Sequence, residues 1–274
     1  MGSIGEAGLN LNYSWMEHPN QRNFHMHAHE DCELLYFTGG HGTYVVEGSE
    51  YRLTPGCVLL MRIGETHMMH IEPDAPYERY VINFLPEMLA PIDPEGRLLE
   101  PFLDRPLGQK NMYTAAQLDS RLIRSCLEMI YATADENAYI QRTAILSGLS
   151  VILFEIGRTF RNGNAPGVAA PQGLIAGVVD FINRNLTENL SLDALSKQFY
   201  LSKSYLNQQF RQATGTTIWD YVLLKRLMLA RTSIRRGVSV TDAFRTSGFN
   251  DYSSFYRRYK SRFGVSPKDD RPRE

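Results

Sequence analysis

Two stretches, LSKSYLNQQFRQATG at residues 201–215 and NDYSSFYRRYKSRFG at residues 250–264, decide the fold of the C-terminal third of the chain. They align at an offset of 49 residues, apolar positions fall on apolar positions, and Gly215 and Gly264 close them. The segments before them also match, at an offset of 48. The repeated unit is therefore a short helix, a turn and a longer helix, with a turn one residue longer in the second copy.

Each longer helix has a predictable start and two different faces. Ser202 and Asp251 are good N-cap residues, because their side-chain oxygens accept hydrogen bonds from free backbone N–H groups. One apolar stripe follows in each helix, with Leu206 and Phe210 in the first copy. The spacing predicts that these stripes face a core.

The opposite stripes are polar and basic. In the first helix this stripe comprises Lys203, Ser204, Asn207, Gln208 and Arg211, and in the second it comprises Tyr252, Ser253, Tyr256, Arg257 and Lys260. Such side chains can read base edges and phosphates in a major groove. One polar helix face usually lies in solvent, but two of them on a repeated helix-turn-helix favour double-stranded DNA as the partner.

The charge distribution agrees with this prediction. The 274 residues carry a formal net charge of −1, yet residues 171–274 carry 17 Lys+Arg against 9 Asp+Glu. The first 170 residues are correspondingly acidic. A basic module joined to an acidic one is typical of a nucleic-acid-binding domain fused to another domain.

One amphipathic helix is predicted between the two units, at residues 217–236. Its apolar face comprises Trp219, Val222, Leu223, Leu227, Ala230 and Ile234. Twenty residues span about 30 Å, close to the roughly 34 Å of one DNA turn. Two recognition helices held this way could enter successive major grooves.

Residues 174–271 resemble the double helix-turn-helix domain of the AraC/XylS family of bacterial transcription regulators. The segments that carry the resemblance are FINRNLTENLSLDALSKQFYLSKSYLNQQFRQATG, the Tyr221–Arg226–Ala230 pattern and SGFNDYSSFYRRYKSRFGVSP. The resemblance implies recognition helices at 202–211 and 250–260. One departure is that Ala243 and Phe244 stand where the family usually has a large aliphatic residue and then alanine.

Within this resemblance, each polar position has an expected role. Lys203, Asn207, Gln208 and Arg257 are the candidates for base contacts, and Arg211, Lys260 and Arg262 are the candidates for phosphate contacts. Ser202, Ser204, Tyr252, Ser253 and Tyr256 complete the candidate DNA-binding set. The resemblance further implies a homodimer and recruitment of RNA polymerase.

The N-terminal part alternates between apolar and polar residues, with Gly and Pro turns. Strand-like runs at 33–38, 42–47, 57–61 and 78–84 predict an antiparallel β-barrel or sandwich. Helical periodicity replaces this pattern near Thr114, with helices predicted near 118–130 and at 137–160. The resemblance implies a cupin-like effector barrel followed by dimerisation helices.

The barrel carries a histidine pattern that resembles metal cupins: His27, His29 and Glu33, followed by Gly64 and His67. The first three alternate, so they share one face of a strand. Three imidazoles and a carboxylate suit zinc, iron, manganese or nickel. The same residues can instead bind an effector without a metal. Sugar, aromatic acid and ion effectors are all open, and the family resemblance favours carbohydrate.

The candidate effector contacts are His25, His27, His29, Glu33, Tyr36, Tyr44, Arg62, His67 and Arg79. The N-terminal arm before His25 is expected to fold over the barrel or onto the DNA-binding domain. An alternative function is a metal-dependent cupin enzyme or metal sensor fused to a DNA-binding domain. The enzyme alternative needs a bound metal with an open coordination position.

The fold predicted overall is a two-domain α+β protein with an all-α C-terminal domain. Its expected parts are a barrel at 1–110, a helical dimerisation region at 111–161, a linker at 162–173 and a DNA-binding domain at 174–274. Three dispersed cysteines, no apolar run of about 18 residues and no basic-apolar leader predict a cytoplasmic protein. The family resemblance implies a transcription regulator that is not an enzyme.

Overall fold

The computed structural model describes residues 2–20, 24–163 and 173–271. Most of the linker expected at 162–173 lies outside these described residues. The chain divides into two compact units: apart from residues 28–30, the first ends at Pro171 and the second begins at Gln172. Each unit is described by itself.

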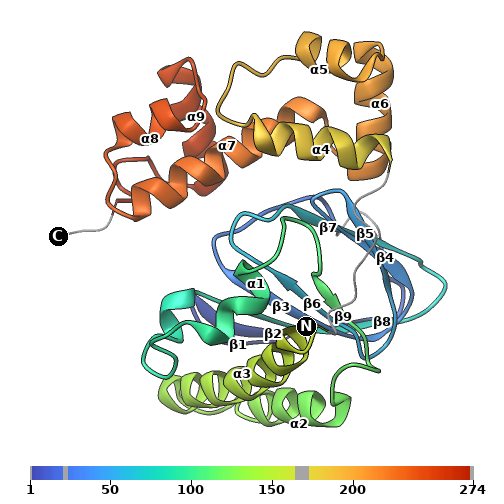
Figure 1. The fold of residues 1–274 in the computed structure, drawn as a ribbon. Coiled ribbons are helices and arrows are strands. Elements are labelled where there is room, and N and C mark those ends of the chain that lie inside the picture. Colours follow the sequence, from blue (N-terminus) through green and yellow to red (C-terminus); the bar gives the residue numbers. More distant parts are fainter. Residues whose placement is uncertain (1, 21–23, 164–172, 272–274) are drawn as a thin grey trace. The chain divides into compact units, whose positions relative to one another are not determined.

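The N-terminal unit contains two antiparallel sheets (Figure 1). The larger sheet has the strand order β1 (Gly2–Glu6), β2 (Leu9–Met16), β8 (Tyr77–Phe84), β3 (Cys32–Gly39), β6 (Val58–Met61) and β9 (Met112–Tyr113). The smaller sheet has the order β5 (Ser49–Leu53), β4 (Gly42–Val46) and β7 (His67–Ile71). The antiparallel β-domain predicted from the alternating pattern is confirmed.

Side-chain alternation gives the larger sheet two apolar faces. Leu34 and Ile82 face one core together with helix residues, whereas Leu35 and Val81 face a second core shared with the smaller sheet. Successive side chains of a strand point to opposite faces, so each central strand serves both cores. The second core is the interior between the sheets, and the candidate histidine site lies beside it.

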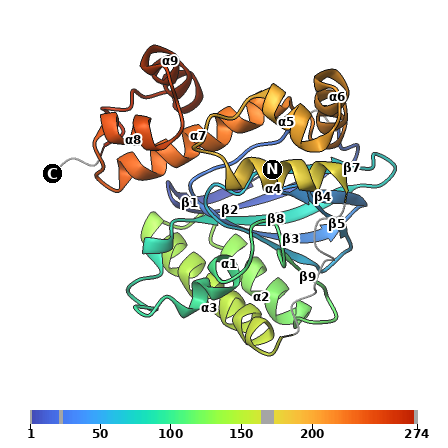
Figure 2. The same cartoon turned by 45° about the horizontal axis from the view of Figure 1, so that its top comes forward.

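Two helices cover the first face, as Figures 1 and 2 show: α2 (Ser120–Tyr131) and α3 (Ala138–Arg161). The predicted stripe of α3, including Ile145, Leu149 and Ile152, is fully buried against the sheet. By length and composition alone α3 could cross a membrane, a property that the sequence reading missed. Half of its most apolar 18-residue window is buried inside the unit.

The N-terminal residues do not form a free arm. Residues 2–16 form β1 and β2, and β2 pairs with β8 over its whole length, from Leu9 to Met16. The expectation that this segment folds over the barrel or onto the other domain is therefore wrong for residues 2–16. Backbone pairing with the edge of β8 satisfies its N–H and C=O groups instead.

A buried ion pair joins the turn between β6 and β7 to the segment that follows helix α1 (Glu100–Leu103). Arg105 donates to Glu65 through both terminal nitrogens at 2.7 Å, and both side chains are completely buried. Glu65 also accepts from the N–H of Gly108 and the amide of Asn111. The pair is thus fully hydrogen-bonded, which a buried charge requires. Two short 3-10 turns, Pro86–Met88 and Arg97–Leu99, complete this region.

The C-terminal unit is all-helical in its described residues and repeats the predicted unit. The first copy has α5 (Leu192–Phe199) and α6 (Lys203–Thr214), and the second has α8 (Val240–Thr246) and α9 (Tyr252–Phe263). Helix α4 (Leu174–Arg184) precedes them, and α7 (Ile218–Arg235) lies between them. The predicted N-caps are confirmed, since Ser202 accepts from the N–H of Tyr205 and Asp251 accepts from those of Ser253 and Ser254.

Helix α7 ties the two copies together. Its buried Arg226 donates to the carbonyls of Leu186 and Glu188, before the first copy. Gly248 in the second copy has φ +82°, and a Cβ there would lie 2.9 Å from the Arg226 Nε and the Leu186 oxygen. Only glycine fits both the backbone angle and the space. Eighteen residues give α7 a length of about 27 Å.

One residue of this unit differs from the sequence prediction, and the departure noted at residues 243–244 has a structural explanation. Trp219 was assigned to the apolar face of the linker helix but is 39% exposed. Ala243 is fully buried, while the ring of Phe244 packs on Tyr252 and Phe255. The exchange of a small and a large residue at 243–244 is accommodated by this aromatic contact.

Replacing Arg105 by alanine should lower the free energy of unfolding by about 3–5 kcal/mol, because Glu65 would keep a buried charge without its main partner. Chemical denaturation of the full chain measures the effect. Arg97→Ala is the matched control: its pair with Glu95 lies in solvent, with side chains 68% and 70% exposed, and should show no measurable change. Equal stabilities of the two variants would contradict this account.

Candidate functional site

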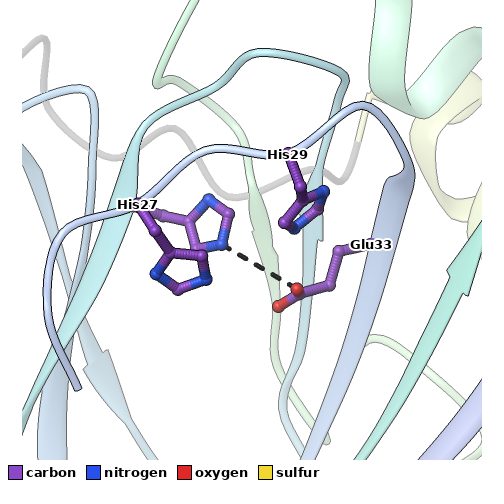
Figure 3. Close-up of side chains that lie close together, drawn as sticks. His27, His29 and Glu33 are labelled. Carbon is purple, nitrogen blue, oxygen red and sulfur yellow. Dashed lines mark ion pairs between the residues drawn. The ribbon is translucent and has the colours of Figure 1, made fainter. Parts of the chain in front are cut away.

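The structure brings together the four residues of the predicted metal motif. One donor atom from each of His27, His29, Glu33 and His67 lies within 4.8 Å of the others (Figure 3). Glu33 is on β3 and His67 on β7, and an isolated backbone bridge joins His27 to His67. The cluster therefore lies where the two sheets approach each other.

Backbone carbonyls orient two of the imidazole rings. The Nδ1 of His27 lies 2.8 Å from the carbonyl oxygen of His25, and that of His67 lies 2.9 Å from the carbonyl oxygen of Glu65. A carbonyl can only accept, so Nδ1 carries the hydrogen and, in the neutral ring, Nε2 keeps its lone pair. Metal-ligating histidines are commonly oriented in this way.

The carboxylate of the cluster is buried and has neighbouring donors. The Tyr44 hydroxyl donates to Glu33 at 3.2 Å, and the Asn83 amide donates at 3.4 Å. The His67 Nε2 lies 3.8 Å from the same carboxylate, and its ring stacks on that of Tyr44. Burial, followed by the charge of Glu33, raises the pKa of Tyr44 well above its ordinary value, so Tyr44 stays a hydrogen-bond donor at neutral pH.

Other predicted effector residues lie elsewhere. Tyr36 faces the helix-covered core, and its hydroxyl donates to the carbonyl of Ser120 at 3.4 Å. Arg62 donates to the carbonyls of Leu103 and Arg105. The structure therefore places neither the Tyr36 nor the Arg62 side chain at the cluster. His25 contributes its backbone carbonyl, which orients the His27 ring.

Sequence reasoning missed two interior residues on β8, Tyr77 and Asn83. Asn83 pairs in register with Glu33, and Tyr77 is completely buried in the core between the sheets. Because Tyr77, Arg79 and Val81 alternate along β8, the sequence indicated that these side chains share one face of the sheet. It did not indicate which core that face contacts. Together with Arg79, these side chains extend the polar interior beyond the histidines.

The candidate DNA-contacting residues form two exposed faces in the C-terminal unit. On α6 with its N-cap the exposed set is Ser202, Lys203, Ser204, Gln208 and Arg211, and on α9 it is Tyr252, Ser253, Tyr256, Arg257, Lys260 and Arg262. The buried stripes beneath them, with Phe210 and Phe255, anchor both helices in the core. The tyrosines Tyr200 and Tyr205, 93% and 47% exposed, adjoin the first face and were missed from sequence.

Asn207 and Lys203 also contact other helices of the unit. Asn207 is half-buried, and its carbonyl oxygen accepts from the N–H of Ile218 at 3.0 Å, at the start of α7. Lys203 forms an ion pair with Asp193 at 2.5 Å. Asn207 thus has a capping role that the helix-face argument did not predict.

The matches to known protein families fall on the same two parts of the chain, the N-terminal and the C-terminal unit. A family model described as an AraC-like ligand binding domain matches residues 16–146, and one described as a helix-turn-helix domain matches residues 195–273. The chain is 26% identical over 252 residues to the HTH-type transcriptional activator RhaS of Escherichia coli O139:H28, covering 91% of this chain and 88% of that protein. It is 24% identical to RhaS of Yersinia pestis, with coverages of 91% and 89%.

Among solved structures, unsaturated fatty acid-bound ToxT from Vibrio cholerae matches 97% of this chain and 95% of its own. The identity is 14% and the TM-score 0.39, too low for an argument from its geometry. A protein from Listeria innocua matches 36% of this chain and 95% of its own, at 27% identity and a TM-score of 0.35.

The fold and the site define a DNA-binding transcription regulator with an attached ligand-binding domain. The chain belongs to the AraC family, as the two family models and the full-length relatives show. This is a family of transcription factors and not of enzymes, which confirms the expectation that the chain is not an enzyme.

Asn207→Ala should lower the free energy of unfolding of the C-terminal unit by about 1 kcal/mol, because the N–H of Ile218 loses its acceptor. Gln208→Ala, at an exposed neighbouring position, should change it by less than about 0.5 kcal/mol. Thermal unfolding of the full chain, followed by circular dichroism, compares the two. A Gln208 variant as unstable as the Asn207 variant would contradict the capping role.

Proposed function

We propose that this chain is a cytoplasmic, homodimeric transcription activator whose N-terminal unit binds a small molecule and thereby changes how two C-terminal units sit on paired DNA half-sites. The observation that carries the proposal is a polar cluster, with Glu33 and His67 buried, in a ligand-binding domain attached to two exposed helix-turn-helix faces. The activator role is proposed from the RhaS relatives, and RNA polymerase is the proposed partner.

In this proposal, Lys203, Gln208 and Arg257 contact base edges and so determine which DNA sequence is bound. Asn207 contributes only its side-chain NH2 group. Arg211, Lys260 and Arg262 contact phosphates. Ser202, Ser204, Tyr252, Ser253 and Tyr256 line the same two faces. The exposure of these residues on helices with buried opposite stripes supports the assignment.

The effector site comprises Tyr44 and Arg79 together with the cluster of His27, His29, Glu33 and His67. A ligand changes the DNA-binding state only if it binds one dimer arrangement more tightly than the other. The interior polar groups, set against an apolar core, suit such a small molecule. A sugar is the effector class that the sequence resemblance favours.

The same cluster is proposed to hold a divalent transition metal. Three nitrogens and one carboxylate oxygen suit zinc, iron, manganese or nickel. Donors about 2.1 Å from one metal lie at most ~4.2 Å apart, so the observed 4.8 Å requires a closure of about 0.6 Å. When bound, the metal would supply a Lewis-acidic contact for an effector oxygen, which makes metal sensing the second candidate function.

Dimerisation is assigned to the helices of residues 111–161. Leu122 and Met129 on α2, and Val151 and Phe154 on α3, are 38–60% exposed although they are apolar. Exposed apolar side chains on helices that already cover a sheet support contact with a second copy. The other proposed boundaries are the barrel at 1–110, the linker at 162–173 and the DNA-binding domain at 174–274.

Gln208→Ala should relax the base preference at one operator position. Arg262→Ala should weaken binding to all sequences alike and reduce the slope of log K against log salt concentration by about 1. Binding-site selection followed by anisotropy titrations at several salt concentrations measures both effects. Arg184→Ala is the control, since Arg184 pairs with Asp180 on α4 and belongs to neither α6 nor α9. An unchanged sequence preference in the Gln208 variant would refute the assignment of the α6 face.

A further inference from the structure

The turn of the first helix-turn-helix copy holds a tyrosine in a backbone conformation that favours glycine. Tyr200 is the C-cap residue of α5, with φ +55° and ψ +36°. This left-handed conformation crowds the Cβ of a bulky residue against its own backbone and is therefore unfavourable. In the second copy the same position, at an offset of 48 residues, is Gly248 with φ +82°. Both copies thus need the left-handed conformation at this turn, and the first meets it with a bulky residue.

Packing does not explain why this residue is a tyrosine. The side chain of Tyr200 is 93% exposed, so its ring gains little from burial within the unit. Aromatic side chains stabilise a fold chiefly through the large area that they bury. A strained backbone position that packing does not compensate is a reason to look for a function. The exposed ring and hydroxyl therefore point to a partner outside the unit.

The turn that carries Tyr200 is held by hydrogen bonds. The carbonyl of Ser196 accepts from the N–H groups of Tyr200 and Leu201, and the Ser196 hydroxyl donates to the carbonyl of Leu201 at 2.5 Å. The next residue is Ser202, which caps α6. Tyr200 is therefore fixed two residues before the N-cap of α6, and its side chain projects from a defined point beside that helix.

This point suits a contact with the DNA backbone. In a helix-turn-helix the second helix enters the major groove by its N-terminal residues, whereas the first helix crosses the backbone. A residue in the turn between α5 and α6 thus lies where the groove meets the phosphates. Residues 191–206 carry two lysines, Lys197 and Lys203, against one aspartate, Asp193, so the surroundings of the turn are positively charged.

We propose that the hydroxyl of Tyr200 donates a hydrogen bond to a phosphate at the edge of the major groove that α6 enters. Tyrosine hydroxyls are among the side-chain donors that contact phosphates, and such contacts set the position of the protein without reading the sequence. The inference rests on the proposed DNA-binding function. It adds a positioning contact outside the two helix faces.

The first test is Tyr200→Phe, which removes only the hydroxyl. Fluorescence anisotropy of the full chain measures its affinity for a duplex with its selected site and for a scrambled duplex, at several salt concentrations. Both affinities should fall about fivefold or more. The slope of log K against log salt concentration should stay at the wild-type value, because a neutral hydroxyl releases no counterion. Arg262→Ala should instead reduce this slope by about 1.

The second test is Tyr200→Gly, which removes the side chain together with the strain. This variant should bind DNA at least as weakly as Tyr200→Phe, yet its melting temperature should not fall below that of the wild type. Lys110→Gly is the matched control, since Lys110 in the N-terminal unit is exposed and also has φ +55°. It should keep its melting temperature and bind DNA like the wild type.

Wild-type affinity of Tyr200→Phe for both duplexes would overturn the inference. A loss confined to the selected site would overturn it as well, because Tyr200 would then contact a base. In either case, the expected effects of the Gln208 and Arg262 variants would leave the DNA-binding function standing. A wild-type chain that binds neither duplex would refute the proposed function and this inference together.

Discussion

The buried pair of Glu65 and Arg105 is the constraint on which the N-terminal site depends. Its hydrogen bonds fix the turn between β6 and β7, and the backbone carbonyl of Glu65 then orients the imidazole of His67. A second buried carboxylate, Glu47, accepts from the N–H and hydroxyl of Thr66 in the same turn. The position of the His67 imidazole in the candidate site thus depends on the buried charges of Glu65, Arg105 and Glu47.

In the C-terminal unit, a single helix, α7, contacts both helix-turn-helix copies. Arg226 bonds to carbonyls before the first copy and packs against Gly248 of the second. Asn207, on the first recognition helix, bonds to the start of α7. Because the linker helix is held from both ends, the two exposed faces keep a defined spacing, which binding to paired grooves requires.

The sequence predicted those features that rest on short-range periodicity. The repeated helices, their caps at Ser202 and Asp251 and the main strands follow local rules. The prediction that His27, His29 and Glu33 share one face of a strand is wrong, because only Glu33 lies in a strand, and His27 and His29 reach the cluster from the segment before β3. Side chains whose roles depend on long-range contacts were missed. Asn207 looked like any polar face residue, and Tyr77 like any aromatic strand residue, until packing showed the acceptor role of one and the buried hydroxyl of the other.

In the metal-sensing form of the proposed function, a metal bound at the N-terminal cluster changes the affinity of the chain for DNA. This claim is tested most directly by the affinity of the full chain for its selected operator, at fixed salt, with and without one equivalent of zinc. The account predicts that zinc changes the Kd of the wild type about tenfold or more, a coupling of roughly 1.4 kcal/mol, and leaves that of His67→Ala unchanged. Equal affinities of the zinc-loaded and zinc-free wild type would contradict it.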